Sequence, residues 1–206
     1  MKKLTFIILG LLSIPAYGNI SSKNYADNAF EPFCDNSPIP EVYAALRAGL
    51  GVKGKNGLLI NPVYGSFCFI GEIVTDLKLS AADAGISFCP GCGACEKHCP
   101  SGAVCKDGFA PGKCVSAITQ KKGELTIEEK ALIKANGSVW GCDGCQDVCP
   151  LNREAAVTPL TEFFVSVYPH YDPAVSFDNR AYSWRPRNVI DRNFQIIYCN
   201  DGENKI

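Results

Sequence analysis

The chain has 206 residues, a formal net charge of -1 and 47% hydrophobic residues, values that suit one compact domain or one domain with a small appendage. The near-zero charge gives no overall attraction to nucleic acid, so any such contact would need a local basic patch. The composition is ordinary for a globular protein except for 12 cysteines, and these carry most of the functional information.

The N-terminal stretch fits two structural classes. Lysines at 2–3 precede an apolar run over 4–14 and a small-residue site at 16–18, a pattern typical of a secretory signal. The same run is rich in β-branched and aromatic residues, which also predicts a buried strand. No other stretch is long and apolar enough to span a bilayer. We interpret residues 1–30 as an apolar and loop segment, either a remnant or signal-like.

Residues 31–80 predict a small α/β segment. Its expected elements are a strand ending near Asp35, a helix over 37–49 and strands over 58–60 and 67–75. Gly49 suits the position that follows a helix C-terminus. The glycines at 49–57 permit tight turns and the close approach of another backbone or of a ligand.

The strongest pattern lies between residues 89 and 150. The runs C-x2-C-x2-C-x3-C-P and C-x2-C-x3-C-P, with one cysteine between them, supply eight thiols, the ligand set of two [4Fe–4S] clusters. In two-cluster ferredoxins, the fourth cysteine of such a run ligates the other cluster. We therefore expect a ferredoxin-like dicluster domain over 81–155. The expected ligands are Cys89, Cys92, Cys95 and Cys149 for cluster one, and Cys142, Cys145, Cys99 and Cys114 for cluster two.

Other interpretations of the cysteines are weaker. A disulfide framework gives no role to the proline after each final cysteine, and zinc sites are a minor alternative. Cys105 is close to cluster two in sequence, but the residues at 106–108 predict a turn, so Cys114 is preferred as the ligand. Cys34 and Cys68 lie in apolar surroundings and are expected to be small buried residues. His98, inside the first run, is expected to be structural or a hydrogen-bond donor to a sulfur.

The remaining chain predicts mainly helices. Thr126 and Glu129 form a capping box that begins a helix, and Asn136-Gly137 ends it near Ala135. A helical tail is expected over 156–206. Its expected elements are a segment over 159–167 and a final helix over 181–198, interrupted near Pro186. The tail holds the only basic concentration of the chain, explained equally well by a solvated helix face or by RNA contact: Arg180, Arg185, Arg187 and Arg192.

Several runs resemble one known family. They are DNSPIPEVYAALRAGLGVKGKNGLLI, then GSFCFIGEIVTDL, then the cysteine array with GCDGCQDVCPLNR. Together they resemble the epoxyqueuosine reductases, which are cobalamin-dependent and carry two [4Fe–4S] clusters. The resemblance runs from Asp35 to Arg153, with a looser match in AYSWRPRNVIDRN. Family members have a larger cobalamin-binding part before the aspartate, so the resemblance implies a short or N-terminally truncated form in which residues 31–80 are a partial cobalamin-binding reductase segment.

The resemblance implies an oxidoreductase that reduces epoxyqueuosine to queuosine at the wobble position of tRNA. Electrons would pass from an external low-potential donor, such as a flavodoxin or ferredoxin, through both clusters to cobalamin. Asp35 would be the general acid that protonates the departing oxygen. The residues implied to line the corrin are Asn56, Leu59, Ile70 and Ser116. Composition alone slightly favours a turn residue or helix cap for Asp35, and an apolar residue such as Ile70 is by default a core residue.

We therefore expect an α+β fold in which a small α/β segment precedes the dicluster domain. Cluster chemistry needs reduced thiols and favours the cytoplasm over the signal-like pattern. We expect a monomer that has no membrane contact. The competing hypothesis is a dicluster, ferredoxin-like electron carrier or a catalytically incompetent fragment.

Overall fold

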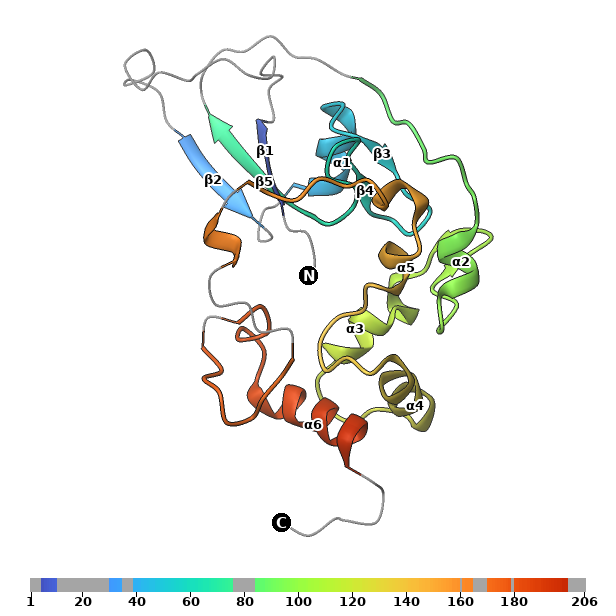
Figure 1. Ribbon diagram of the computed structural model, residues 1–206, viewed down its shortest axis with the longest axis vertical. Helices are drawn as coiled ribbons and strands as arrows, with labels where there is room; N and C mark the ends of the chain where they lie inside the picture. The colour runs from blue at the N-terminus through green and yellow to red at the C-terminus, as the bar shows by residue number, and fades with distance from the viewer. Residues whose placement is uncertain are drawn as a thin grey trace. The chain divides into compact units, whose positions relative to one another are not determined.

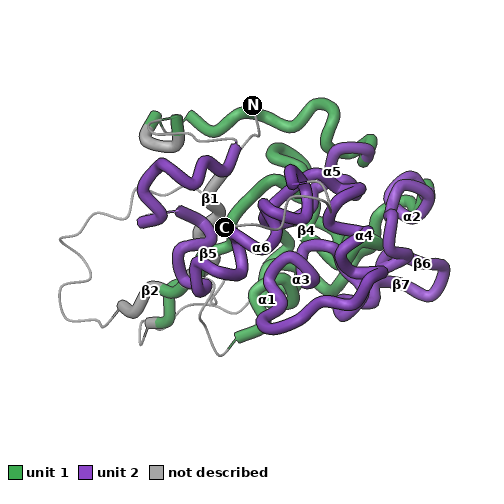
Figure 2. The backbone as a smooth tube through the Cα atoms, turned by 90° about the horizontal axis from the view of Figure 1, so that it is seen from below, with its two compact units in different colours: residues 1–92, 149–165 green, residues 93–148, 166–206 purple. Residues whose placement is uncertain are grey.

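The structure is a computed structural model that describes residues 5–10, 30–34, 39–75, 84–159, 161–164, 170–178 and 180–199. The chain divides into two compact units (Figure 2). Unit 1 comprises residues 1–92 and 149–165, and unit 2 comprises residues 93–148 and 166–206. Helices and strands are mixed along the chain (Figure 1), which confirms the α+β class. The four-part division expected from the sequence stays a prediction. In the described ranges, no helix combines the length and the apolar character that a membrane span needs.

Unit 1 contains a three-stranded sheet in the order β1-β5-β2. Its strands are β1 (Thr5–Gly10), β2 (Phe30–Cys34) and β5 (Cys68–Thr75). β5 is the central strand, with β1 parallel to it and β2 antiparallel. β1 lies within the N-terminal apolar run, as expected from the strand interpretation of that run. Residues 1–4 and 11–29 lie outside the described part.

One helix covers the apolar face of β5. α1 (Glu41–Arg47) contributes Ala45 and Leu46 to a core in which Leu59 is also buried, and Ile70 packs against it. α1 is shorter than expected because it begins only after Pro40, which has no backbone N–H and suits a helix start. Its end agrees with the sequence, since Gly49 has a φ of 75°.

A small hairpin follows α1. Its strands, β3 (Val52–Lys53) and β4 (Leu59–Ile60), pair antiparallel. A Cβ at Gly51 would lie 2.2 Å from the carbonyl oxygen of Ile60. The hairpin's own close packing therefore requires a glycine at this position, whether or not a ligand approaches it.

Unit 2 is built from short helices and one tight hairpin. Its elements are α2 (Ala94–His98), β6 (Val104–Cys105), β7 (Gly108–Phe109), η2 (Pro111–Lys113), α3 (Val115–Thr119), α4 (Ile127–Asn136), α5 (Gly144–Asp147) and α6 (Arg187–Tyr198). The capping box expected before α4 is present. The Thr126 hydroxyl accepts the Glu129 N–H at 3.2 Å, and the Glu129 carboxylate accepts the Thr126 N–H at 2.9 Å.

α6 differs from its prediction in one respect. It begins at Arg187 rather than near residue 181, and Pro186 is its N-cap. A proline disfavours the α conformation in the residue before it, so the preceding segment forms turns instead. Ile196 and Ile197 of α6 pack against the second buried core, which consists of Ile118, Leu125 and Ile133.

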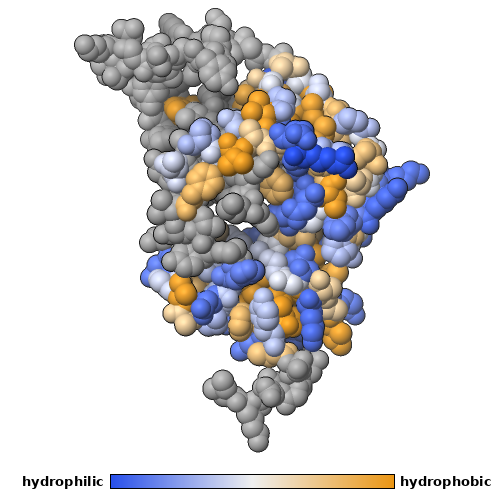
Figure 3. Space-filling view, viewed as in Figure 1, coloured by the Kyte–Doolittle hydropathy of each residue, from blue (hydrophilic) through white to orange (hydrophobic). Residues whose placement is uncertain are grey.

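The remaining described elements are two 3-10 helices of unit 1, η3 (Pro150–Asn152) and η4 (Thr161–Phe164). η4 falls inside the helical segment expected over 159–167, of which 160 and 165–167 are not described. Figure 3 shows hydrophobic and hydrophilic residues interspersed over the visible described surface.

Candidate functional site

The four predicted ligands of cluster two all lie in unit 2. Cys99 caps the C-terminus of α2, and Cys145 lies on α5, which packs against α2. The thiols of Cys114 and Cys99 are close enough to Cys142 to act on it electrostatically. Burial raises the pKa of Cys142, a backbone hydrogen bond from Gly144 lowers it, and the neighbouring Cys114 and Cys99 raise it further. These three cysteines come from the end of α2, the start of α3 and the loop before α5.

The Cys99 sulfur receives several hydrogen bonds. Burial disfavours its thiolate, but hydrogen bonds from the backbone N–H groups of Val104, Ser101 and Ala103 and from the Ser101 hydroxyl lower its pKa overall. The distance from Cys99 Sγ to Ser101 Oγ is 3.6 Å. Donors aimed at a sulfur stabilise the thiolate that iron binds, and they tune cluster potential. The loop after α2 is thus suited to hold a ligand thiolate.

His98 has a packing role, in agreement with the expectation that it is structural. A Cβ at Gly144, the first residue of α5, would lie 3.2 Å from His98 Cδ2 and 3.9 Å from Cys142 Sγ. The imidazole therefore packs closely against the start of α5.

Cys105 and Cys114 lie in different local structures. Cys105 pairs with Gly108 across the β6–β7 hairpin, which contains the turn expected at this point. Cys114 caps the N-terminus of α3 and acts electrostatically on Cys142. This arrangement supports the choice of Cys114 as the ligand.

The predicted ligands of cluster one are divided between the units. Cys89, Cys92 and Cys149 belong to unit 1, and Cys95 belongs to unit 2. Cys89 is held by β3, because its N–H donates to the Lys53 carbonyl at 3.0 Å. The Lys53 N–H in turn donates to the Ser87 carbonyl at 2.8 Å. The chain leading to Cys89 therefore extends the β3–β4 hairpin.

Cys149 is anchored through the residue three positions later. Asn152 is buried, and its side-chain oxygen accepts the Ser66 N–H at 2.8 Å. Its amide nitrogen donates to the Ser66 hydroxyl at 2.9 Å. A Cβ at Gly65 would lie 2.3 Å from the Asn152 oxygen. Asn152 thus ties the segment after Cys149 to the loop between β4 and β5.

Within the described ranges, no three His, Cys, Asp or Glu side chains converge closely enough to hold one metal ion. Such convergence is the geometry of a single-ion site, as for zinc. The four thiolates of a [4Fe–4S] cluster each bind a different iron atom and lie farther apart.

The residues implied to line a corrin are accounted for mostly by local packing. Leu59 is 2% exposed and belongs to the core, with Ile70 half-buried against it. Asn56 is 5% exposed, and its oxygen fills the space beside Gly54. Ser116 lies on α3 in unit 2.

The candidate acid, Asp35, lies outside the described residues, as do the residues up to 38. The residue before it, Cys34, ends β2 and pairs with Gly71 of β5. The side chain of Cys34 is also outside the described part, so its predicted burial stays a prediction. Cys68 is half-buried and packs against the core, close to expectation.

Sequence reasoning missed Glu72, in the middle of β5. Its side chain is 1% exposed, and neither carboxylate oxygen has a hydrogen-bond partner among the described residues. Ile70 lies two residues earlier in the same strand, so both side chains point to the face that α1 covers. A buried acceptor without a donor is costly and calls for a group that donates. The available signal was a charged residue inside an otherwise apolar strand.

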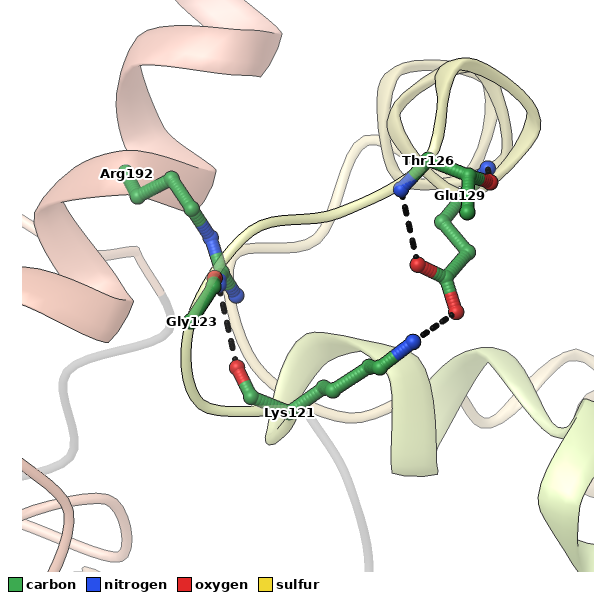
Figure 4. A network of polar contacts seen from close by, with 5 residues as sticks. All are labelled: Lys121, Gly123, Thr126, Glu129 and Arg192. Carbon is green, nitrogen blue, oxygen red and sulfur yellow. Dashed lines mark hydrogen bonds and ion pairs between the residues drawn. The ribbon is translucent and has the colours of Figure 1, made fainter.

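The arginines of the C-terminal segment do not form one solvated face. Arg192 points back into unit 2, where its Nη1 donates to the carbonyls of Lys121 at 3.0 Å and Gly123 at 2.7 Å (Figure 4). The Lys121 ammonium also pairs with Glu129 at 2.8 Å. Arg192 is therefore a structural anchor of α6.

Arg185 and Arg187 have different surroundings. Arg185 stacks on Trp184, with 4.2 Å from its guanidinium carbon to the ring centroid, and the indole is 62% exposed. Arg187 donates to the Pro173 carbonyl at 2.6 Å and pairs with Asp191 at 3.6 Å. An exposed aromatic side chain beside a guanidinium is suited to stacking against a base.

Comparison with known proteins gives one consistent result. The family model of the 4Fe-4S double cluster binding domain matches residues 88–152. An epoxyqueuosine reductase of Listeria monocytogenes is 34% identical over 187 residues, which are 83% of this chain and 48% of that protein. One of Cyclobacterium marinum is 42% identical over 125 residues, 59% of this chain and 39% of that protein.

Solved structures agree with the sequence comparison. The epoxyqueuosine reductase of Streptococcus thermophilus superposes with a TM-score of 0.66 and 28% identity, over 85% of this chain and 49% of that one. An epoxyqueuosine reductase in complex with an epoxyqueuosine-modified tRNA-Tyr stem loop has a TM-score of 0.64 and 26% identity, over 82% and 48% of the two chains. The chain thus resembles this family along most of its length and spans about half the length of these relatives.

Proposed function

We propose, from its homology to epoxyqueuosine reductases and its double cluster domain, that the chain acts in the reduction of epoxyqueuosine to queuosine in tRNA. The observation that carries the proposal is the similarity over 83% of the chain, which includes the α/β segment before the cysteines as well as the cysteine array. A ferredoxin would need only the array.

The eight cysteines would hold two [4Fe–4S] clusters, which supply one-electron transfer at low potential. The proposed ligands of cluster two are supported by their common place in unit 2, where α5, which carries Cys145, packs against α2, whose C-terminus Cys99 caps. Those of cluster one are supported by the anchoring of Cys89 on β3 and of the segment after Cys149 through Asn152. An external low-potential donor would reduce the clusters.

Cobalamin is the second proposed cofactor, and it would supply the reductant that attacks the epoxide. Its corrin ring carries amide side chains, which are hydrogen-bond donors. Ile70 is a candidate from the resemblance, and its side chain packs against the core of unit 1. Asn56, Leu59 and Ser116 stay candidates from the resemblance.

Asp35 is the proposed general acid. It directly follows β2 in the sequence, and its proposed role comes from the resemblance. The proposed substrate is tRNA, and the Trp184–Arg185 stack offers one site for base contact. Reduced thiols favour the cytoplasm as the compartment.

A cobalamin titration tests the proposal. Protein reconstituted with iron and sulfide without oxygen should perturb the visible spectrum of added cobalamin. An unchanged corrin spectrum would refute the cobalamin proposal. Asp35→Ala should abolish epoxide reduction with the cluster absorbance intact, and retained turnover would remove Asp35 from the mechanism.

The cysteine assignment has its own test. Cys114→Ala should lose about four of about eight iron atoms, whereas the matched variant Cys105→Ala should lose none. Equal loss from both variants would contradict the assignment.

A second candidate is a dicluster electron carrier. It is favoured by the burial of Leu59 in the core, which leaves fewer groups to face a corrin. A carrier would hold both clusters and leave the cobalamin spectrum unchanged.

A further inference from the structure

Asn193, on α6, is a buried polar side chain of unit 2 whose amide nitrogen and oxygen both have hydrogen-bond partners. It is 0% exposed. Its amide nitrogen donates to two carbonyls, Thr119 at 2.7 Å and Val139 at 2.9 Å. Its amide oxygen accepts from Arg192 Nε at 3.1 Å and Nη2 at 2.9 Å. The guanidinium fixes the orientation of the amide, so the nitrogen must face the two carbonyls.

The two carbonyls belong to segments that carry different cysteines. Thr119 ends α3, the helix capped by Cys114. Val139 lies in the loop that leads to Cys142. A third contact joins the same segments, since the buried Thr119 hydroxyl accepts the Gly141 N–H at 3.0 Å. One amide and one hydroxyl therefore hold the Cys114 helix beside the Cys142 loop.

We propose that Asn193, together with Thr119, is a positioning element for cluster two, which sets the separation of Cys114 and Cys142 from the far end of the chain. The inference rests on the proposed ligand set and assigns α6 a role in it. Neither residue contacts the cluster in this proposal. They act by fixing the backbone from which two of its four thiolates project, as outer contacts commonly do around metal ligands.

The chemistry of the amide explains why a general packing role is insufficient. Only a side chain with a donor and an acceptor can satisfy two carbonyls and a guanidinium at once. Aspartate has nearly the same shape and would keep the Arg192 contact, but it has no donor for the carbonyls. Asn193→Asp therefore removes the hydrogen bonds to the two carbonyls while it keeps the contact with Arg192.

The first experiment measures iron in anaerobically reconstituted full-length protein. Asn193→Asp should lose about half of its iron, and it should lose no further iron in the Cys114→Ala background, because both changes act on the same cluster. Full iron in Asn193→Asp overturns the inference, as does a loss that adds to that of Cys114→Ala. A Cys114→Ala protein with full iron would instead refute the proposed ligand set.

A pair of milder variants, at Thr119, tests the inference if Asn193→Asp does not fold. Thr119→Val removes the hydroxyl bond to Gly141, and Thr119→Ser keeps it. Redox titration followed by electron paramagnetic resonance should show one cluster potential shifted in Thr119→Val and the other unchanged, with both at wild-type values in Thr119→Ser. Unshifted potentials in Thr119→Val, or equal shifts of both clusters, would overturn the inference.

Discussion

Gly65→Ala is expected to destabilise unit 1 far more than an ordinary glycine substitution. Gly65 has a φ of 64°, and its missing Cβ would lie 2.3 Å from the side-chain oxygen of Asn152. The left-handed conformation alone costs about 1–2 kcal/mol for alanine. Displacing Asn152 would also leave the buried Ser66 N–H unsatisfied, for roughly 1–3 kcal/mol. The expected total is about 2–5 kcal/mol.

Gly85→Ala is the matched control. Gly85 also belongs to unit 1 and has a φ of 69°, but a Cβ there meets nothing within 4 Å. Its cost should therefore be only the conformational part, about 1–2 kcal/mol. The assay is urea unfolding of the reconstituted protein without oxygen, followed by far-ultraviolet circular dichroism and by the visible absorbance of the clusters.

The origin of the extra cost is tested by a double-mutant cycle. In an Asn152→Ala background the colliding oxygen is gone, and the nearest side-chain atom is the Ala155 Cβ at 3.2 Å. The difference between Gly65→Ala and Gly85→Ala should then shrink to less than about 1 kcal/mol. Equal unfolding free energies for the two alanine variants in the wild-type background would refute the reasoning.

Three further outcomes are expected. Burial raises the pKa of the Cys68 thiol from 9.0 to about 11, so at pH 8 iodoacetamide should alkylate it about 100-fold more slowly than a peptide thiol; similar rates in peptide mapping would contradict this. Thr126→Ala should lower the unfolding free energy by about 1 kcal/mol through loss of the capping box, whereas Thr126→Ser should not. Burial and its hydrogen bond to Asp191 raise the pKa of Tyr171 from 10.0 to about 12. The stability that the raised pKa of Tyr171 contributes is complete below pH 10 and is lost as pH rises through 12. Tyr171→Phe should therefore flatten the fall of the unfolding free energy at alkaline pH. An unaltered slope would contradict this.

Elements encoded by local signals were predicted well. Thr126, Glu129 and Gly137 bound α4 as expected, because capping and left-handed glycines act within one helical turn. Gly49 ends α1 for the same reason. The cysteine spacing likewise identifies a double cluster domain over 88–152, because the array is a local ligand code.

Arrangements that depend on distant partners were not predictable. Nothing in the run containing Thr5–Gly10 specifies that it pairs parallel to β5, because parallel strands join through long connections. The sequence pattern places Asn193 at a polar position of an amphipathic helix. In the structure it is fully buried, and its amide bonds two carbonyls, one from α3 and one from the loop before Cys142. The burial of Glu72, a charged residue within an otherwise apolar strand, was likewise not predictable from the sequence.

The bond between the Cys89 N–H and the Lys53 carbonyl couples the position of Cys89 to the pairing of β3. While Cys89 is held in place, residues 87–89 cover one side of the β3 strand. If oxidation frees that segment, β3 gains an unpaired edge that another copy of the chain could extend.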